Sequence, residues 1–312
     1  MTKDKQKLSF IVATKDRPTD LRKMLQSLSD QLIHSEQIII VDASKESVEK
    51  ITAEFCQLNI KYIRHPWPSA SKQRNAGIKS VGPDIELIGF LDDDIVLEDG
   101  AIEKMLEFWR QAPEDVGGCA FNLKNPVSRS ELALKRSSLA KWLGIYSKEK
   151  GVVMPSGWHT LTGTVSKTTF VRWLPSGASI WRRNIFEKFR FDEYFDGYSY
   201  LEDLDFSFSV SKSHRLAVVA EAGFYHYPSP FGRISHYRFG KIEVANRLYF
   251  VRKHNLSVPR CYLGLFLRLL MSSGAVMTGT GLENLHRVAG NCTGLFQSLL
   301  PGHIAFSLDS IK

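Results

Sequence analysis

The chain has 312 residues, of which 43% are hydrophobic and 24% are charged, with a formal net charge of +8. This composition supports a globular protein with a large core in one elaborated domain and argues against two independent domains. The positive charge favours an anionic partner, either a nucleotide diphosphate, an anionic lipid or a nucleic acid. No known RNA- or DNA-binding motif accompanies the charge, so we expect no nucleic-acid partner.

Short β-branched runs alternate with helix-like segments along the first third of the chain. The expected strands cover residues 8–14, 37–42, 60–64 and 87–91. The expected helices cover residues 19–30, 71–81 and 98–109. The first helix shows the pattern well, because apolar residues from Leu21 to Leu28 recur at helical spacing just after Pro18. This βαβα order predicts an α/β fold built on parallel strands.

Three consecutive aspartates, Asp92, Asp93 and Asp94, follow the fourth expected strand. Their mutual repulsion is costly at a strand end unless a cation or a substrate offsets it. Ligands of open α/β sheets lie at the carboxyl ends of the strands, where Asp16 and Asp42 also lie. We therefore expect one crevice to collect these acids and to hold a divalent metal. The alternative for such an acidic run is a solvated turn or a helix N-terminus.

Five motifs together resemble a family 2 glycosyltransferase, an inverting and metal-dependent enzyme with the GT-A fold. They are residues 10–17 (FIVATKDR), 41–44 (VDAS), 74–77 (RNAG), 90–94 (FLDDD) and 200–203 (YLED). The resemblance covers roughly residues 8–255 and implies a Rossmann-like mixed α/β sheet flanked by helices. We see no Gln-x-x-Arg-Trp element and no set of membrane spans after residue 255, which favours a non-processive enzyme.

The resemblance implies a division of the chain. A GT-A domain would cover residues 1–255, with a nucleotide-binding half at 1–121, an insertion at 122–171 and an acceptor half at 172–255. Residues 256–312 would form a helical C-terminal extension. Within the insertion we expect a helix over residues 131–143.

The family pattern also implies a donor site. Its nucleotide-binding residues would be Thr14, Asp16, Arg17, Asp42, Arg74, Asp92, Asp93 and Gly177. Asp42 would accept a hydrogen bond from the base, or it forms a turn or caps a helix. Asp16 would approach the base or ribose, or cap the helix that starts near Thr19. Arg74 would meet base or phosphate, or form a surface ion pair.

A second group of residues would serve the diphosphate. In the family pattern Asp94 binds Mn²⁺ or Mg²⁺, while Asp92 faces the ribose or shares the metal through water. Asp93 is alternatively a solvated turn residue. His226 would touch the metal or the diphosphate, unless its role is structural. Gly177 would let the backbone approach a sugar.

An inverting transfer needs a carboxylate to remove the acceptor hydroxyl proton. By resemblance, Asp203 is this general base and Glu202 positions acceptor hydroxyls, with Asp205 as an alternative base. The acids could instead complement the dipole of a helix N-terminus. Upstream, Trp181 would stack on a sugar face or lie in the core.

The C-terminal part places basic residues before an apolar segment at residues 262–282. This segment is a buried helix, an interfacial helix or, less in keeping with its Gly, Ser and Thr residues, a membrane span. The four cysteines are scattered and no secretory apolar region follows Met1, so we expect reduced thiols in a cytoplasmic protein, peripheral on the inner face of the cell membrane if the helix is interfacial.

The sequence therefore predicts transfer of one sugar from a nucleotide-diphosphate sugar to a glycan or lipid-linked acceptor in cell-surface polysaccharide synthesis. One alternative is a non-catalytic nucleotide-binding scaffold of the same fold. Another is a sugar nucleotidyltransferase, which needs a basic triphosphate loop that is not found near Thr14.

Overall fold

A computed structural model describes residues 6–32, 35–126, 141–231, 234–277 and 283–300. The chain divides into two compact units. One consists of residues 1–129 and 161–232, and the other of residues 130–160 and 233–312. These divisions differ from the expected boundary at residue 255. Most of the helix expected over residues 131–143 lies outside the described residues.

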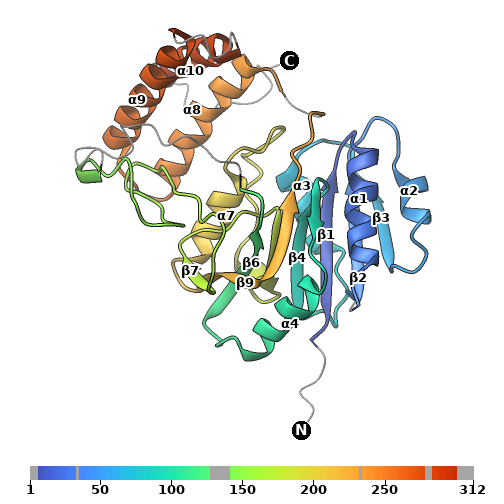
Figure 1. The fold of residues 1–312 in the computed structure, drawn as a ribbon. Coiled ribbons are helices and arrows are strands. Elements are labelled where there is room, and N and C mark those ends of the chain that lie inside the picture. Colours follow the sequence, from blue (N-terminus) through green and yellow to red (C-terminus); the bar gives the residue numbers. More distant parts are fainter. Residues whose placement is uncertain (1–5, 33–34, 127–140, 232–233, 278–282, 301–312) are drawn as a thin grey trace. The chain divides into compact units, whose positions relative to one another are not determined.

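The first unit is built on one mixed sheet (Figure 1). Its strands are β1 (Leu8–Thr14), β2 (Gln37–Asp42), β3 (Ile60–Arg64), β4 (Leu87–Asp92), β5 (Ile95–Leu97), β6 (Val116–Leu123), β7 (Thr169–Val171), β8 (Ala178–Arg182) and β9 (Arg215–His226). Their order is β3-β2-β1-β4-β8-β6-β9-β5, and β7 pairs with β9. The first four strands run parallel, whereas β8 lies antiparallel between β4 and β6.

Helices cover both faces of this sheet. They are α1 (Pro18–Ser29), α2 (Glu49–Ala53), α3 (Ala70–Lys79), α4 (Ala101–Gln111), α6 (Ile185–Lys188) and α7 (Glu202–Val210). Strand β1 is mostly apolar, because neighbouring side chains point to opposite faces and both faces are covered. Phe10 and Val12 belong to one core cluster, and Ile11 belongs to the other.

Aromatic rings fill the core between β8 and α7. Trp181 is fully buried, and its ring lies 4.9 Å from that of Phe206, which stacks on Phe191 at 4.4 Å. The core position that the sequence favours for Trp181 is therefore right, and the alternative of stacking on a sugar is wrong. The indole N–H donates a hydrogen bond to the Ser179 hydroxyl at 3.0 Å, which satisfies the buried polar atom.

Trp181→Ala is expected to lower the free energy of unfolding by about 3–5 kcal/mol, because it removes a fully buried ring and leaves a cavity. The measurement is urea unfolding of the purified protein. Trp67→Ala is the matched control, since the side chain of Trp67 is 65% exposed. Its effect should stay within about 0.5 kcal/mol. Equal losses for the two variants would contradict the assignment of Trp181 to the core.

The second unit contains α8 (His236–Lys253), α9 (Val258–Met277) and α10 (Glu283–Leu299). Helices α8 and α10 approach closely at Gly290. A Cβ at this position would lie only 2.0 Å from the Tyr237 carbonyl oxygen. The buried Glu243 carboxylate of α8 accepts a hydrogen bond from Arg287 of α10 at 2.8 Å. Helix α8 thus packs with the C-terminal helices, which explains why the division falls before α8 and not after it.

Helix α9 contains most of the apolar segment at residues 262–282. Cys261 and Leu265 are buried, whereas Phe266 and Leu270 are about half exposed. None of the helices in the described part of the chain is long and apolar enough to cross a membrane. All four cysteines are free thiols.

Candidate active site

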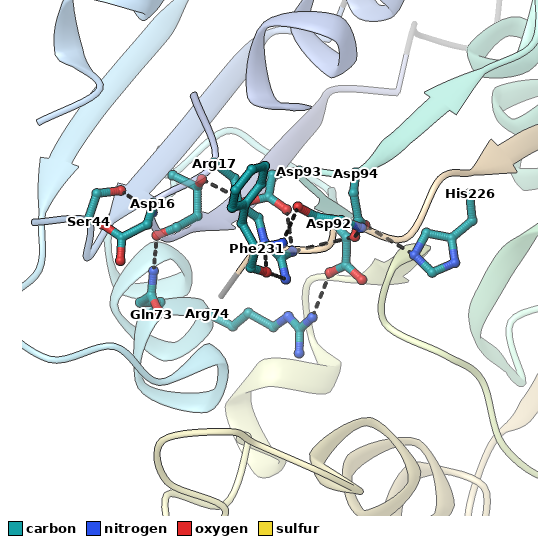
Figure 2. A network of polar contacts seen from close by, with 12 residues as sticks. Asp16, Arg17, Ser44, Gln73, Arg74, Asp92, Asp93, Asp94, His226 and Phe231 are labelled. Carbon is teal, nitrogen blue, oxygen red and sulfur yellow. Dashed lines mark hydrogen bonds and ion pairs between the residues drawn. The ribbon is translucent and has the colours of Figure 1, made fainter. Parts of the chain in front are cut away.

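The strand register brings the acidic loops together. Thr14 at the end of β1 lies beside Asp42 at the end of β2, and Ala13 lies beside Asp92 at the end of β4. The loops that follow these three strands therefore meet at one edge of the sheet, as the sequence predicts. Figure 2 shows the side chains of this edge.

Asp93 points inward from this edge. It is 2% exposed, and its carboxylate accepts hydrogen bonds from the Thr14 hydroxyl at 2.7 Å and from Arg17 Nη1 at 2.9 Å. The alternative of a solvated turn residue is therefore wrong. Burial raises the pKa of Asp93 to about 7, although Arg17 and the Thr14 hydroxyl act in the opposite direction. Asp93 fixes the loop that follows β1 and is not placed to meet a ligand directly.

Asp94 contacts the predicted histidine. Its Oδ1 lies 3.1 Å from His226 Nε2, and its Oδ2 accepts hydrogen bonds from the Ser229 N–H at 3.1 Å and from Arg17 Nη1 at 3.4 Å. Strand β9 delivers the histidine, because His226 pairs with Ile95, the residue after Asp94. Burial acts to raise the pKa of Asp94, but His226, the Ser229 N–H and Arg17 together outweigh it and the pKa is lowered. The same hydrogen bond raises the pKa of His226.

Arg74 joins Asp92 to Glu202. From α3, its Nη2 donates to Asp92 Oδ1 at 3.0 Å and its Nη1 donates to Glu202 Oε1 at 2.8 Å. The Arg74 side chain is only 6% exposed, so the surface ion pair considered for it is wrong. The acids of β4 and of α7 thus belong to one network of side chains.

Gly177 provides space for Asp92. The Asp92 N–H donates to the Gly177 carbonyl at 2.8 Å, and a Cβ on Gly177 would lie 2.7 Å from Asp92 Oδ2. A side chain at this position would push the carboxylate away. The close neighbour of Gly177 is thus the Asp92 side chain, and its approach to a sugar stays a prediction.

The acidic pair Glu202 and Asp203 opens α7. The preceding Leu201 is buried and has φ +77°, a left-handed conformation that is unusual for leucine and is typical of functional sites. Burial raises the pKa of both acids, that of Glu202 to about 8. Asp203 is partly exposed, whereas Asp205 is 1% exposed and less accessible to a substrate.

Asp42 is saturated with hydrogen bonds. It is fully buried and accepts from the Ser44 and Val48 N–H groups at 2.7 and 3.1 Å, and from Tyr62 and Arg64, each at 2.7 Å. These are the contacts of the turn-forming alternative. Arg64 is close because it pairs with Asp42 in the register of β2 and β3.

Asp16 faces the same loop and has φ +54°. Its Oδ1 accepts a hydrogen bond from the Lys45 N–H at 2.7 Å, and its own N–H donates to the Ser44 hydroxyl at 2.7 Å. Helix α1 begins after Arg17 without a side-chain cap, so the capping role considered for Asp16 is wrong.

Sequence reasoning missed several residues that build this site. Gln73 is buried and donates to the Thr14 carbonyl at 3.0 Å and to the Val41 carbonyl at 2.7 Å, which joins the ends of β1 and β2. The sequence signal that could have identified Gln73 is its position next to Arg74 in the polar first turns of α3. The Phe231 carbonyl accepts hydrogen bonds from the Arg17 guanidinium at 3.1 and 3.2 Å. Nothing in the sequence marks this contact.

The predicted metal ligands are only partly assembled. Asp94 and His226 are adjacent, whereas Asp92 bonds to Arg74. Among the described residues, no group of three or more His, Cys, Asp or Glu side chains could hold a metal ion.

Comparisons with known proteins identify the family. A family model described as glycosyl transferase family 2 matches residues 9–166. An uncharacterised glycosyltransferase of Bacillus subtilis, YwdF, is 33% identical over 135 residues, which cover 41% of this chain and 50% of that protein. The chain thus matches about half the length of this curated relative.

Solved structures of S. aureus TarS share the fold. TarS 1–349 superposes with a TM-score of 0.56 at 15% identity, over 96% of this chain and 82% of TarS 1–349. Its complex with UDP-GlcNAc gives a TM-score of 0.57 at 16% identity, over 96% and 83% of the two chains. The predicted α/β GT-A class with flanking helices is confirmed. This chain belongs to glycosyl transferase family 2 and has the GT-A fold of that family.

Proposed function

We propose that this chain transfers one sugar from a nucleotide-diphosphate sugar to a hydroxyl acceptor, with inversion at the anomeric carbon. The observation that carries the proposal is the Asp92–Arg74–Glu202 network, which joins the donor end of the sheet to the acidic pair on α7. TarS has been solved with UDP and with UDP-GlcNAc, which favours a UDP-sugar as the donor here.

The donor nucleotide is assigned to the carboxyl ends of β1, β2 and β4. The residues concerned are Thr14, Asp16, Arg17, Asp42, Asp92, Asp93 and Gly177, while Arg74 lies beside them and contacts Asp92. Asp16 and Arg17 are at least partly exposed and are available to the ligand. The buried carboxylates of Asp42 and Asp93 act on it through the loops that they hold.

Asp94 and His226 would hold a divalent ion. A carboxylate oxygen and an imidazole nitrogen 3.1 Å apart suit Mn²⁺, and Mg²⁺ is often held by one or two carboxylates plus substrate phosphates. Asp92 is the third ligand candidate, through water. When bound, such an ion would supply positive charge that stabilises the departing diphosphate.

Asp203 acts as the general base. The acceptor oxygen forms a bond to the anomeric carbon, the bond from that carbon to the diphosphate breaks, and the acceptor proton passes to the Asp203 carboxylate. Glu202 shares the start of α7 and is held by Arg74, so it can orient acceptor hydroxyls beside the base. Residues 1–121 would then serve the donor and residues 172–255 the acceptor.

The test is a thermal-shift panel of UDP-, GDP-, dTDP- and CDP-sugars with and without Mn²⁺ or Mg²⁺. A ligand that binds only the folded state raises Tm by mass action. We expect a metal-dependent shift with one nucleotide class, followed by release of that nucleoside diphosphate during turnover. Release of pyrophosphate would instead identify a nucleotidyltransferase, and binding without any turnover would identify a scaffold.

The acceptor is proposed to be a glycan or lipid-linked sugar of the cell surface, reached from the membrane. In the second unit, Arg252, Lys253 and Arg260 are exposed, and Phe266 and Leu270 of α9 are exposed apolar side chains. Basic and apolar groups together suit peripheral binding to an anionic membrane. The protein should float with anionic liposomes at low salt, and failure to do so would remove this proposal.

The pH profile tests the base pair. Because burial raises the pKa of Asp203, its carboxylate stays protonated to a higher pH than an ordinary aspartate and cannot then accept the acceptor proton. We therefore expect kcat/KM to rise with pH above the ordinary range of aspartate. A rise centred near pH 4, the ordinary range of aspartate, would contradict the assignment.

A further inference from the structure

We infer that Arg74 is a positioning residue that fixes the acidic start of α7 against the acidic end of β4, and that it does not bind the donor. This inference rests on the proposed function. It replaces the family-based expectation that Arg74 meets the nucleotide base or phosphate. If it is right, Arg74 sets the placement of the base relative to the donor.

The contacts of the guanidinium account for this role. Two different nitrogens of the planar group reach two carboxylates, Asp92 at 3.0 Å and Glu202 at 2.8 Å. The group also lies over the Phe191 ring, 5.4 Å from its centroid. Because the fork is rigid, it holds these carboxylates at a set separation. With 6% of the side chain exposed, little of it is left for a nucleotide.

Helix α3 holds the chain leading to α7 at further points. Asn75 exchanges hydrogen bonds with the Phe191 backbone, at 2.8 Å from its Nδ2 and 3.1 Å to its Oδ1. The Ser71 hydroxyl donates to the Phe195 carbonyl at 3.2 Å. Of these contacts, the one between Arg74 and Glu202 is the furthest along the chain, and it lies at the acidic pair. Helix α3 is thus a platform that sets where α7 begins.

The charges around Arg74 make it hard to replace. Its guanidinium lies among the carboxylates of Asp92, Glu202 and Asp203, and it acts electrostatically on all three. Removal of a buried cation leaves the neighbouring acids to repel one another. Such repulsion would move α7 away from β4. A displacement of about 1 Å at a catalytic group can cost about 10²-fold in rate.

The experiment compares Arg74→Gln and Arg74→Lys with the wild type. We expect kcat to fall about 10²-fold for Arg74→Gln, while the Kd for UDP measured by calorimetry changes less than about threefold. Arg74→Lys keeps the charge but reaches both acids less well, so it should restore part of the lost rate.

Arg182→Gln is the matched control. Arg182 lies in the same unit, donates to the Val116 carbonyl at 2.9 Å, and packs over the Trp109 ring at 5.0 Å. It therefore resembles Arg74 in packing but touches none of the catalytic acids. We expect it to lower Tm and to leave kcat per folded molecule unchanged. An equal loss of kcat in Arg74→Gln and Arg182→Gln would reduce Arg74 to a purely structural role.

Two other results would overturn the inference. A tenfold weaker Kd for UDP in Arg74→Gln with unchanged kcat would show that Arg74 binds the donor. A double-mutant cycle measured by Tm then tests the contact between Arg74 and Glu202 without any assay of activity. Arg74→Gln and Glu202→Gln should be non-additive, with the double variant losing less than the sum. Additive losses of Tm would disprove the contribution of this contact. Non-additive losses of Tm in a protein without turnover would refute only the proposed function.

Discussion

Asp203→Asn is expected to lower kcat by about 10²–10⁴-fold, the usual contribution of a general base, with little change in donor affinity. Asparagine has nearly the same shape, and its amide oxygen can keep the 2.7 Å hydrogen bond from the Leu204 N–H. It cannot accept the acceptor proton. Initial rates with donor and acceptor, together with calorimetry of UDP binding, measure the two quantities separately.

The control for this prediction is Asp196→Asn. Asp196 lies in the segment before α7 and pairs with Lys72 at 2.9 Å, with both side chains about 30% exposed. Loss of such an exposed pair costs little, so the transfer rate should stay near that of the wild type. A fully active Asp203→Asn variant would exclude Asp203 as the base and direct attention to Glu202.

Asp94→Ala is expected to abolish the part of donor binding that depends on Mn²⁺ or Mg²⁺. A bound ion stabilises the leaving diphosphate by several kcal/mol, which corresponds to a loss of about 10²–10³-fold in kcat/KM. The substitution also leaves His226 and the Ser229 N–H without the carboxylate that they contact. Calorimetry of UDP binding with and without Mn²⁺ gives the measurement.

Asp99→Ala serves as the control, because Asp99 is exposed and lies only five positions further along the chain. It should bind UDP and Mn²⁺ as the wild type does. If Asp94→Ala kept metal-dependent binding, the proposed ion would have to be held elsewhere, and the pairing of Asp94 with His226 would be structural.

The sequence was informative where the signal is local. Strands β1, β2 and β4 are rich in apolar residues, and their parallel pairing places their ends, and hence Asp16, Asp42 and Asp92, at one edge. That part of the fold could be predicted from the apolar pattern of the strands and the positions of their ends alone. The environment of Asp93 could not, because its burial depends on how Thr14 and Arg17 turn after β1.

The partners of the site residues depend on contacts between distant parts of the chain. Arg74 meets Glu202, which lies 128 positions later, and no local pattern announces such a pair. Asp42 is similar, since its burial is completed by Tyr62 and Arg64 of the neighbouring strand. Motif resemblance indicated the chemical type of these residues, but their contacts follow from the folded sheet.

The antiparallel strand β8 was also beyond sequence reasoning, and so was the grouping of α8 with α9 and α10. Strand β8 is only five residues long, and its sequence is interpreted as a segment near a sugar site. Its pairing with β4 and β6 is decided by the whole sheet. Helix α8 lacks a clear apolar face, and its partner α10 begins about 30 residues after α8 ends.

The pairing of β6 has a consequence for biosynthesis. Strand β6 pairs with β8 and β9, and both of these strands follow residue 166, where the match to the family ends. A fragment cut at residue 166 would leave this buried strand without either partner and β4 with an open edge, so we expect it to aggregate when expressed alone. On the ribosome, the edges that pair with β8 stay open until residue 182 has emerged, and the other edge of β6 stays open until β9 ends at residue 226. The recognisable half of the chain is thus a unit of homology that needs the remainder of its sheet in order to fold.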